Sequence, residues 1–379
     1  MPGYKIYSAD SHVSEPGDLW LQRIDEAFRF RAPRLESRER NGRSEDFFCY
    51  EGFPPHPVSI GLGAAARGDA AAFRAAGKGY RDALAGGWDP VERLKDQDYD
   101  GVEGEVLYTT LGFRLFWLEH AGLQRACFRV YNDWLAEFCS HSPHRLVGLA
   151  LISLYDIEAA RAELRRASSL GHRGAMIWLS PPAGAPSYSS TVYDPFWAEA
   201  QELGLPLVLH ENTGGGESRL SPSSYWNENI SLGTIVRPHE VQRTLGVLIL
   251  SGVLERFPGL KLVSAENGTD WLPWFIGRVE ASAARAGSYP TKLSLKPIDY
   301  LRRQIYFTYI DEPHAVENRG IIGVDRLMFS TDYPHSASTW PRSQQIVERD
   351  MIDVPADERR RLVHDNVLQA FDIPAPVTA

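Results

Sequence analysis

The stretch that decides the fold class reads YKIYSADSHVSEPGDLW and spans residues 4–20. Its first part, residues 4–10, is a short apolar run with the length and composition of a buried β-strand. The residues that follow, DSHVSEPGDLW, lack the glycine-rich turn that binds phosphate after the first strand of a doubly wound sheet. This pattern favours a closed barrel over an open, doubly wound sheet.

The rest of the chain alternates between strand-like and helix-like stretches. Strand-like runs recur at residues 102–108, 146–152, 174–179, 205–210, 260–266, 304–309 and 327–332. Helix-like stretches lie at residues 120–141, 157–170, 194–203, 239–257, 269–286, 313–322 and 341–351. Eight strands that alternate with helices indicate a parallel sheet covered on both faces, and eight such units close into a barrel. We therefore predict an α/β fold, a (β/α)8 barrel of the TIM type.

Two segments interrupt the alternation. Residues 17–101 are too long for a connection and become Gly/Ala-rich at 61–79, so we expect an insertion that caps the barrel mouth or forms an oligomer contact. Residues 212–238 form a Gly/Ser-rich loop, and such loops at this barrel face carry substrate contacts. We treat residues 1–379 as one barrel domain that ends, at 353–379, in a helix and a disordered tail.

Composition limits the classes of partner. The chain carries 40 Lys+Arg against 49 Asp+Glu, a net charge of −9, whereas nucleic-acid and anionic-membrane surfaces need clustered positive charge. No apolar run approaches the about 20 residues of a membrane span, and the first residues do not resemble a secretory signal. Cys49, Cys127 and Cys139 are odd in number and lack metal-like spacing. We expect reduced cysteines and a cytoplasmic protein that binds neither nucleic acid nor membrane.

Ionisable residues stand at the ends of four predicted strands. Asp10 and His12 end the first, His210 the fifth, Glu266 the sixth and Asp332 the eighth. Residues two apart in a strand face the same side, and all strand ends meet at the C-terminal barrel face, where active sites lie. Carboxylates gathered there repel one another unless a cation holds them. The mixture of carboxylate and imidazole therefore predicts a divalent-metal site.

Two further residues are conditional candidates for the metal. Glu105, in the second strand, reaches the barrel interior only if that strand has the matching register. His239 stands at the start of a helix on the active face, although Pro-His-Glu could simply begin that helix, with Glu240 favoured by the helix dipole. Glu266 and His239 are also the candidates for the catalytic acid or base.

Aromatic and basic residues near the same face are candidates for substrate binding. Trp117 and Trp226 would line an aromatic pocket, although such residues also fill ordinary cores. Arg114 could bind a carboxylate or phosphate, because a guanidinium group matches planar oxyanions. His335 fits a substrate contact better than a metal ligand. These features suit a small-molecule substrate, an apolar organic acid or its thioester.

A family resemblance rests on the segments ADSHVSEP (9–16), DPFWAEAQELGLPLVLHEN (194–212), LILSGVLERFPGLKLVSAENG (248–268) and FSTDYPH (329–335). The chain resembles the amidohydrolase superfamily, in particular the branch that includes non-oxidative aromatic-acid decarboxylases. The resemblance implies a distorted (β/α)8 barrel with a metal at its C-terminal face, and a homo-oligomer. It also implies that Asp10 and His12 form the first-strand ligand pair, with His210 and Asp332 as the ligands from strands five and eight.

Two positions depart from the pattern of that branch. The first-strand pair is Asp-x-His where His-x-His or Glu-x-His is usual, and Glu266 stands where the decarboxylases carry a catalytic His. With Glu105 and His239, the ligand pool exceeds the about four ligands that one zinc takes. Oxygen-rich ligands suit iron or manganese, and four carboxylates with two histidines are typical of di-iron proteins. We therefore expect a non-haem di-iron monooxygenase that uses two Fe, O2 and an electron donor.

Two other functions remain open. With one Zn or Mn, the family's own chemistry would be metal-assisted hydrolysis or non-oxidative decarboxylation of a small carboxylic acid, with Glu266 or His239 as the acid or base. A barrel that binds a metal or ligand without turnover is the non-enzymatic alternative, because a fold does not settle function. Iron content with O2 consumption separates the oxygenase from the decarboxylase, and absence of bound metal favours the third.

Overall fold

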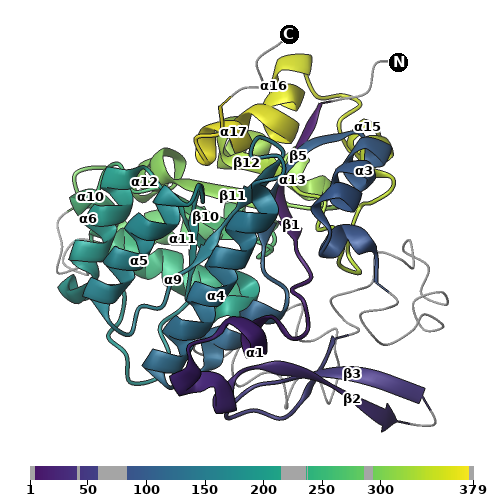
Figure 1. The fold of residues 1–379 in the computed structure, drawn as a ribbon. Coiled ribbons are helices and arrows are strands. Elements are labelled where there is room, and N and C mark those ends of the chain that lie inside the picture. Colours follow the sequence, from purple (N-terminus) through teal and green to yellow (C-terminus); the bar gives the residue numbers. More distant parts are fainter. Residues whose placement is uncertain are drawn as a thin grey trace.

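A ring of parallel strands forms the centre of the computed structural model, which describes residues 5–40, 43–58, 83–214, 236, 238–285 and 293–374 (Figure 1). Neighbours along the chain are neighbours in the ring, in the orders β1-β5-β6 and β7-β8-β9-β10-β11-β12. Every pair within these two sheets is parallel. The strands are β1 Ile6–His12, β5 Val102–Tyr108, β6 Leu146–Gly148, β7 Ala150–Leu151, β8 Ala175–Ile177, β9 Leu207–His210, β10 Leu262–Ala265, β11 Ile305–Tyr309 and β12 Leu327–Phe329.

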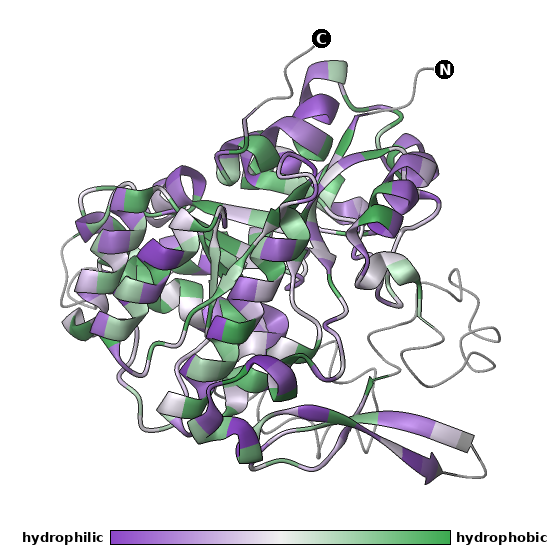
Figure 2. Ribbon diagram, in the orientation of Figure 1, coloured by the Kyte–Doolittle hydropathy of each residue, from purple (hydrophilic) through white to green (hydrophobic). Residues whose placement is uncertain are grey.

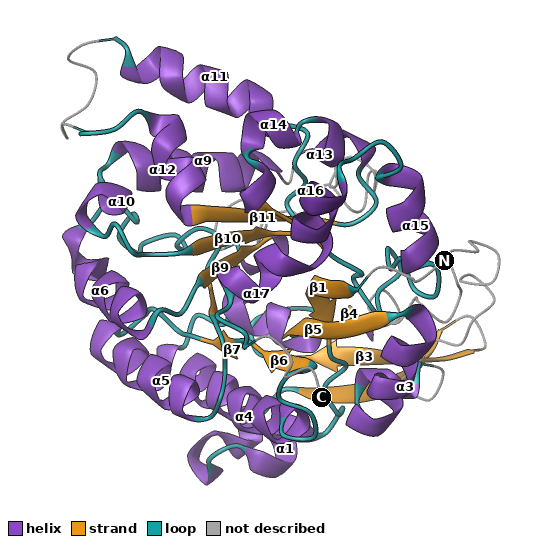
Figure 3. Ribbon diagram, turned by 90° about the horizontal axis from the view of Figure 1, so that it is seen from above, coloured by secondary structure: helices purple, strands orange, loops and turns teal. Residues whose placement is uncertain are grey.

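Main-chain hydrogen bonds close the two sheets into one barrel. At one seam β6 and β7 are halves of a single strand, interrupted at Leu149, whose N–H donates to the Leu107 carbonyl at 3.2 Å. At the other seam, the N–H of Asp332 donates to the Asp10 carbonyl at 3.0 Å, and the N–H of His12 donates to the Tyr333 carbonyl at 2.6 Å. The view down the barrel shows the strands surrounded by helices (Figure 3). The predicted α/β barrel is confirmed.

Helices cover the outside of the ring, and they carry both polar and apolar residues where the strands are mostly apolar (Figure 2). Local signals set their ends: α3 begins where the Asp89 side chain accepts the Val91 N–H at 2.8 Å, and it ends at Gly101, which has a φ of 72°. The helices of the wall are α3 Pro90–Asp100, α4 Ala121–Cys139, α5 Ile157–Ser169, α6 Asp194–Leu203, α9 Pro238–Leu250, α10 Val253–Arg256, α11 Leu272–Ala283, α12 Pro297–Gln304, α13 Pro313–Glu317, α14 Arg319–Ile322 and α15 Ser343–Asp350.

The segment expected as an insertion has two structural parts. Its first part lies outside the barrel and consists of α1 Leu19–Arg23, a 3-10 helix Glu26–Arg31 and an antiparallel sheet of β2 Arg34–Arg40, β3 Arg43–Cys49 and β4 His56–Pro57 (Figure 1). Its last part, α3, belongs to the barrel wall beside β5. The Gly/Ala-rich residues 61–79 lie outside the described residues, so a cap or an oligomer contact stays a prediction.

The C-terminal helix expected within residues 353–379 is present in three pieces. They are α16 Ala356–Arg360, a π-helical turn Arg361–Asp365 and α17 Asn366–Ala370. The end of the expected tail, residues 375–379, lies outside the described residues. None of the described helices has the length and apolar character needed to cross a membrane.

Candidate metal centre

The end of β1 brings two buried side chains into the barrel mouth. Asp10 and His12 are two residues apart, so the alternation of the strand points both inward. His12 Nε2 lies 3.3 Å from Asp10 Oδ1, and its Nδ1 lies 2.9 Å from the main-chain oxygen of Thr109. If Nδ1–H donates to that carbonyl, the lone pair of Nε2 faces the carboxylates, which is the orientation of a metal-binding histidine.

The turn after β12 adds a second carboxylate and a second imidazole. Asp332 Oδ1 lies 3.1 Å from His12 Nε2 and 3.1 Å from His335 Nδ1. His335 also stacks on the His12 ring, with ring centroids 3.8 Å apart, and its Nε2 lies 2.9 Å from Thr110 Oγ1. The strand itself ends at Phe329, three residues before Asp332, which has a left-handed φ of 52° that a continuing strand would not tolerate.

β9 and β10 complete the cluster from the opposite side of the mouth. Their register pairs His210 with Ala265, so Glu266 follows directly beside the histidine. His210 Nε2 lies 3.1 Å from Glu266 Oε2 and 3.8 Å from Asp10 Oδ2. Glu266 has a φ of 54°, and a non-glycine residue in this region marks a strained position that often belongs to a functional site.

The buried polar atoms fit a divalent cation. Ligand atoms of Asp10, His12 and His210 lie within 4.8 Å of one another, and so do those of His12, Asp332 and His335. None of the four carboxylate oxygens of Asp10 and Asp332 accepts a hydrogen bond from the residues that the structure describes. Two buried carboxylates with unsatisfied oxygens beside imidazole nitrogens are the arrangement that a divalent metal stabilises.

Burial dominates the electrostatics of this cluster. It raises the pKa of Asp10 well above its usual range, and the charges of Glu266 and Asp332 add to that shift. Burial also lowers the pKa of His12 to about 4. For Asp332, burial acts to raise the pKa, but His335 and His12 together hold it below its ordinary value. Without a counter-charge, the site therefore disfavours two negative charges at once. A bound cation would stabilise both carboxylates in their charged forms.

Aromatic residues and one buried glutamate shape the wall beside the cluster. Phe113 packs on the His210 ring with centroids 4.3 Å apart. It belongs to a 3-10 helix, Leu111–Trp117, whose first N–H groups donate to the buried Glu15 carboxylate, from Leu111 at 2.9 Å and from Gly112 at 3.1 Å. Glu15 thus caps the helix that carries Phe113, Arg114 and Trp117.

Sequence patterns did not identify Thr109 as a residue of the site. It contacts His12 through its main-chain oxygen, so the type of its side chain gives no indication of this role.

The structure does not bring Glu105 to this cluster. Tyr108 faces inward, with its ring 5.7 Å from the ring of His12, and Glu105 is an odd number of residues away in the same strand. Glu105 therefore lies on the outer face of the sheet, where its Oε2 accepts from Arg93 Nε at 2.5 Å and from Gln97 Nε2 at 2.6 Å. The condition on its register is not met.

His239 also stays apart from the cluster. It is exposed in the first turn of α9, while the next residue, Glu240, is buried and accepts a hydrogen bond from Ser180. Successive residues of a helix point about 100° apart, so the rotation of α9 that buries Glu240 turns His239 outward. This matches the alternative interpretation, in which Pro-His-Glu begins a helix.

Of the expected substrate contacts, three are described. Arg114 lies over the ring of Trp117 at 4.8 Å, and its Nη2 lies 2.9 Å from His56 Nε2. The indole nitrogen of Trp117 donates to the Gly214 carbonyl at 3.1 Å, and His335 contacts the ligand cluster itself. Trp226 lies outside the described residues.

The family model described as amidohydrolase matches residues 56–373. The chain belongs to the amidohydrolase family. Gamma-resorcylate decarboxylase of Rhizobium radiobacter is 28% identical to this amidohydrolase over 248 residues, which cover 61% of this chain and 74% of the relative. The resemblance found in the sequence is thereby confirmed, including the decarboxylase branch.

Solved structures share the fold of this amidohydrolase. An amidohydrolase from Mycobacterium avium subsp. paratuberculosis superimposes with a TM-score of 0.76 at 21% identity, and the match covers 97% of this chain and 99% of that one. A dihydroxybenzoic acid decarboxylase from Polaromonas sp., solved with bound manganese and the inhibitor 2-nitroresorcinol, gives a TM-score of 0.67 at 19% identity, with 97% of each chain covered. At these identities the likeness concerns the fold alone.

The expected di-iron monooxygenase is wrong. The curated relatives are decarboxylases, among them gamma-resorcylate decarboxylase and 2-amino-3-carboxymuconate-6-semialdehyde decarboxylase. The expectation of two Fe, O2 and an electron donor falls with it. The prediction of two metals counted Glu105 and His239 as possible ligands. Because Glu105 pairs with Arg93 and His239 is exposed, the number of candidate ligands in the described residues falls toward the number that one metal takes.

Proposed function

We propose that this protein is a divalent-metal-dependent decarboxylase of an aromatic carboxylic acid. The observation that carries the proposal is the convergence of Asp10, His12, His210 and Asp332 at the C-terminal ends of the barrel strands, in a family whose curated relatives here are decarboxylases. Manganese is the metal that we favour, because the donor set mixes carboxylate and imidazole and a solved neighbour holds manganese. One zinc is the alternative.

Decarboxylation needs one proton and no redox partner. The bond between the ring carbon and the carboxylate carbon breaks, CO2 leaves, and the electron pair that stays on the ring carbon takes up a proton. A bound divalent metal supplies Lewis-acid polarisation and orientation of a substrate oxygen. The protein itself must hold the ring in place and deliver the proton.

Glu266 is the residue that we propose as the proton carrier. Its side chain is 21% exposed, more than the side chains of Asp10, His12 and His210, so a substrate in the mouth can reach it. One of its carboxyl oxygens, Oε2, lies 3.1 Å from His210 Nε2, so the group stands beside the candidate metal ligands. His239 is exposed on α9 and has no place in this mechanism.

Arg114, Trp117 and His335 are the proposed substrate contacts. The cation–π contact holds the Arg114 guanidinium over the ring of Trp117, and its neighbour Phe113 packs on His210. An aromatic acid offers the matching features, a flat ring for the aromatic wall and an oxyanion for the guanidinium. His335, held between Asp332 and Thr110, would contact a polar substituent of the ring.

The test is CO2 release from a panel of hydroxybenzoates, beginning with 2,6-dihydroxybenzoate, by metal-free protein reconstituted with Mn2+. We expect equal rates with and without O2, and one deuterium on the product ring carbon when the reaction runs in D2O. The variant Asp332→Asn should lose turnover. Tight Mn2+ binding without CO2 release from any member of the panel would contradict the proposed function.

A further inference from the structure

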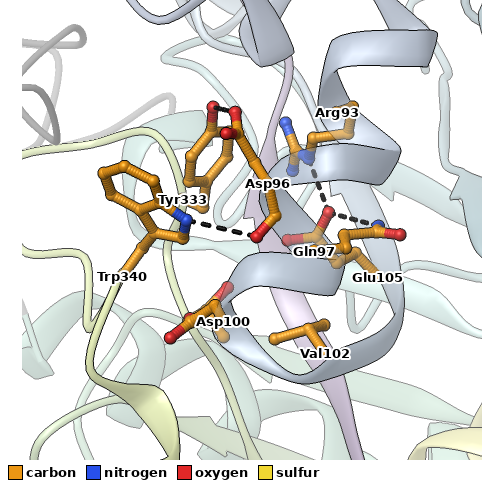
Figure 4. A pocket seen from close by; sticks show the side chains of 9 residues that line it. Arg93, Asp96, Gln97, Asp100, Val102, Glu105, Tyr333 and Trp340 are labelled. Carbon is orange, nitrogen blue, oxygen red and sulfur yellow. Dashed lines mark hydrogen bonds and ion pairs between the residues drawn. The ribbon is translucent and has the colours of Figure 1, made fainter.

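A buried arginine lies directly behind the ligand cluster. Arg93, in the first turn of α3, is 0% exposed. Its Nη1 donates to the main-chain carbonyl of His12 at 2.7 Å and to that of Gly86 at 3.2 Å. Its Nε forms the ion pair with Glu105 on β5 (Figure 4). One guanidinium group therefore connects the helix, β5 and the end of β1.

The same guanidinium contacts the turn that carries Asp332. It lies over the ring of Tyr333 at 4.4 Å, and the Tyr333 hydroxyl donates to Asp96, three residues after Arg93 on the same face of α3 (Figure 4). The main-chain oxygen of Tyr333 in turn accepts the N–H of His12. α3 thus holds both strand ends from which His12 and Asp332 project.

Stability alone does not account for this ion pair. Two charges removed from water lose their hydration, and replacing a buried pair by well-packed apolar residues is often neutral or stabilising. The geometry of this pair is fixed at both partners. Gln97 Nε2 donates to the same Glu105 oxygen, and Arg93 uses Nε for Glu105 and Nη1 for the His12 carbonyl. Such fixed geometry matches the supporting residues around metal ligands, which orient a ligand rather than bind the ion.

We infer that Arg93, oriented by Glu105, is a positioning residue that sets metal affinity by holding the His12 and Tyr333 segments in register. The inference rests on the metal centre of the proposed function, and it assigns Glu105 to Arg93 instead of to the metal. Lysine cannot reproduce the contacts, since a single ammonium group lacks the planar fork that reaches Glu105, the His12 carbonyl and the Tyr333 ring together.

The test measures Mn2+ dissociation constants by titration calorimetry on metal-free protein, and unfolding by urea separately. We expect Arg93→Lys and Glu105→Gln to weaken Mn2+ binding by about 10- to 100-fold, the usual cost of losing such a support. Glu199→Gln is the matched control, because Glu199 is a buried carboxylate that pairs with Arg161 and Arg165 between α5 and α6. It should bind Mn2+ as the wild type does.

A second pair of variants keeps the inference testable if Arg93→Lys does not fold. Tyr333→Leu removes the ring under the guanidinium and should weaken Mn2+ binding. Tyr333→Phe keeps that ring and should bind Mn2+ more tightly than Tyr333→Leu. Unchanged affinity in Arg93→Lys or Tyr333→Leu would overturn the inference, as would an equal loss in Glu199→Gln. A wild type that does not bind Mn2+ overturns both proposals. Mn2+ binding without decarboxylation overturns the proposed function and leaves this one standing.

Discussion

Glu266 Oε2 lies 3.1 Å from His210 Nε2 although the backbone of Glu266 is left-handed, at a φ of 54°. The β9–β10 register places Ala265 opposite His210, so the chain must turn sharply at the next residue to leave the strand and still face the histidine. The N–H of Glu266 donates to Thr308 Oγ1 at 3.1 Å, and the buried Asn267 donates to the Leu209 carbonyl at 2.9 Å. These contacts hold a conformation that costs about 1–3 kcal/mol for such a residue.

Replacing Glu266 separates that strain from the chemistry. Asn adopts the left-handed region more readily than Glu, so Glu266→Asn should leave the urea unfolding free energy of the metal-free protein unchanged or raise it by about 0.5–1 kcal/mol. Decarboxylation should fall by about 100-fold or more, because the proton carrier is lost. Glu266→Ala is the control for the stability effect, because alanine also lacks the carboxyl group but does not relieve the left-handed backbone strain. A Glu266→Asn variant with near wild-type turnover would rule out Glu266 as the proton carrier.

Metal removal should lower stability through the buried carboxylates. With Mn2+ at about 1,000 times its dissociation constant, binding adds about 4 kcal/mol to the unfolding free energy, which a chelator removes. Asp10→Asn should abolish this difference between loaded and chelated protein. It should also stabilise the metal-free protein by about 1 kcal/mol, because it removes a carboxyl group whose charged form is disfavoured by burial and by the nearby Glu266 and Asp332. Thermal melts with Mn2+ and with chelator measure both effects, and equal metal stabilisation in wild type and Asp10→Asn would exclude Asp10 as a ligand.

Loss of the Glu15 cap should reach the substrate wall. Its carboxylate accepts the N–H groups of Leu111 and Gly112, so Glu15→Ala leaves buried donors unsatisfied at a cost of about 2–4 kcal/mol. The helix that loosens carries Phe113 and Arg114, and KM for the aromatic acid should rise more than kcat falls. The exposed Glu158 serves as control, and Glu158→Ala should change stability by less than about 0.5 kcal/mol. Equal stability of the two variants would show that Glu15 is no cap.

A buried carboxyl on α3 gives a pH-dependent stability. Burial raises the pKa of Asp100 to about 6, against hydrogen bonds from Ser343 that lower it. The folded protein therefore binds the Asp100 proton more tightly than the unfolded chain does. The contribution of this protonated carboxyl group to the unfolding free energy is full below about pH 4 and is lost as the pH rises through 6.

Asp100→Asn should flatten that part of the stability curve. Relative to the variant, the wild type should lose on the order of 2 kcal/mol between pH 4 and pH 7, measured as the difference in urea unfolding free energy. Asp98→Asn, at an exposed position two residues away, should track the wild type at every pH. A constant difference between wild type and Asp100→Asn would contradict the raised pKa.

Local sequence patterns predicted the barrel strands, most of the barrel helices and part of the buried cluster. Asp10 and His12 were placed together correctly because a strand alternates with a period of two, which needs no knowledge of the rest of the fold. His210 and Asp332 followed from the rule that parallel strand ends meet at one face. α12 was not expected, because it has only eight residues, although its buried residues Pro297, Tyr300, Leu301 and Gln304 recur with helical spacing.

What the sequence by itself determined is therefore most of the barrel's elements and the residues whose direction follows from local alternation. Only the tertiary structure decided which face of β5 and of α9 turns inward, and this removed Glu105 and His239 from the cluster. It also decided that Arg93, for which no sequence pattern predicted a role, is buried against the His12 carbonyl. Register, helix rotation and backbone contacts depend on packing between segments far apart in the chain, and no local pattern encodes them.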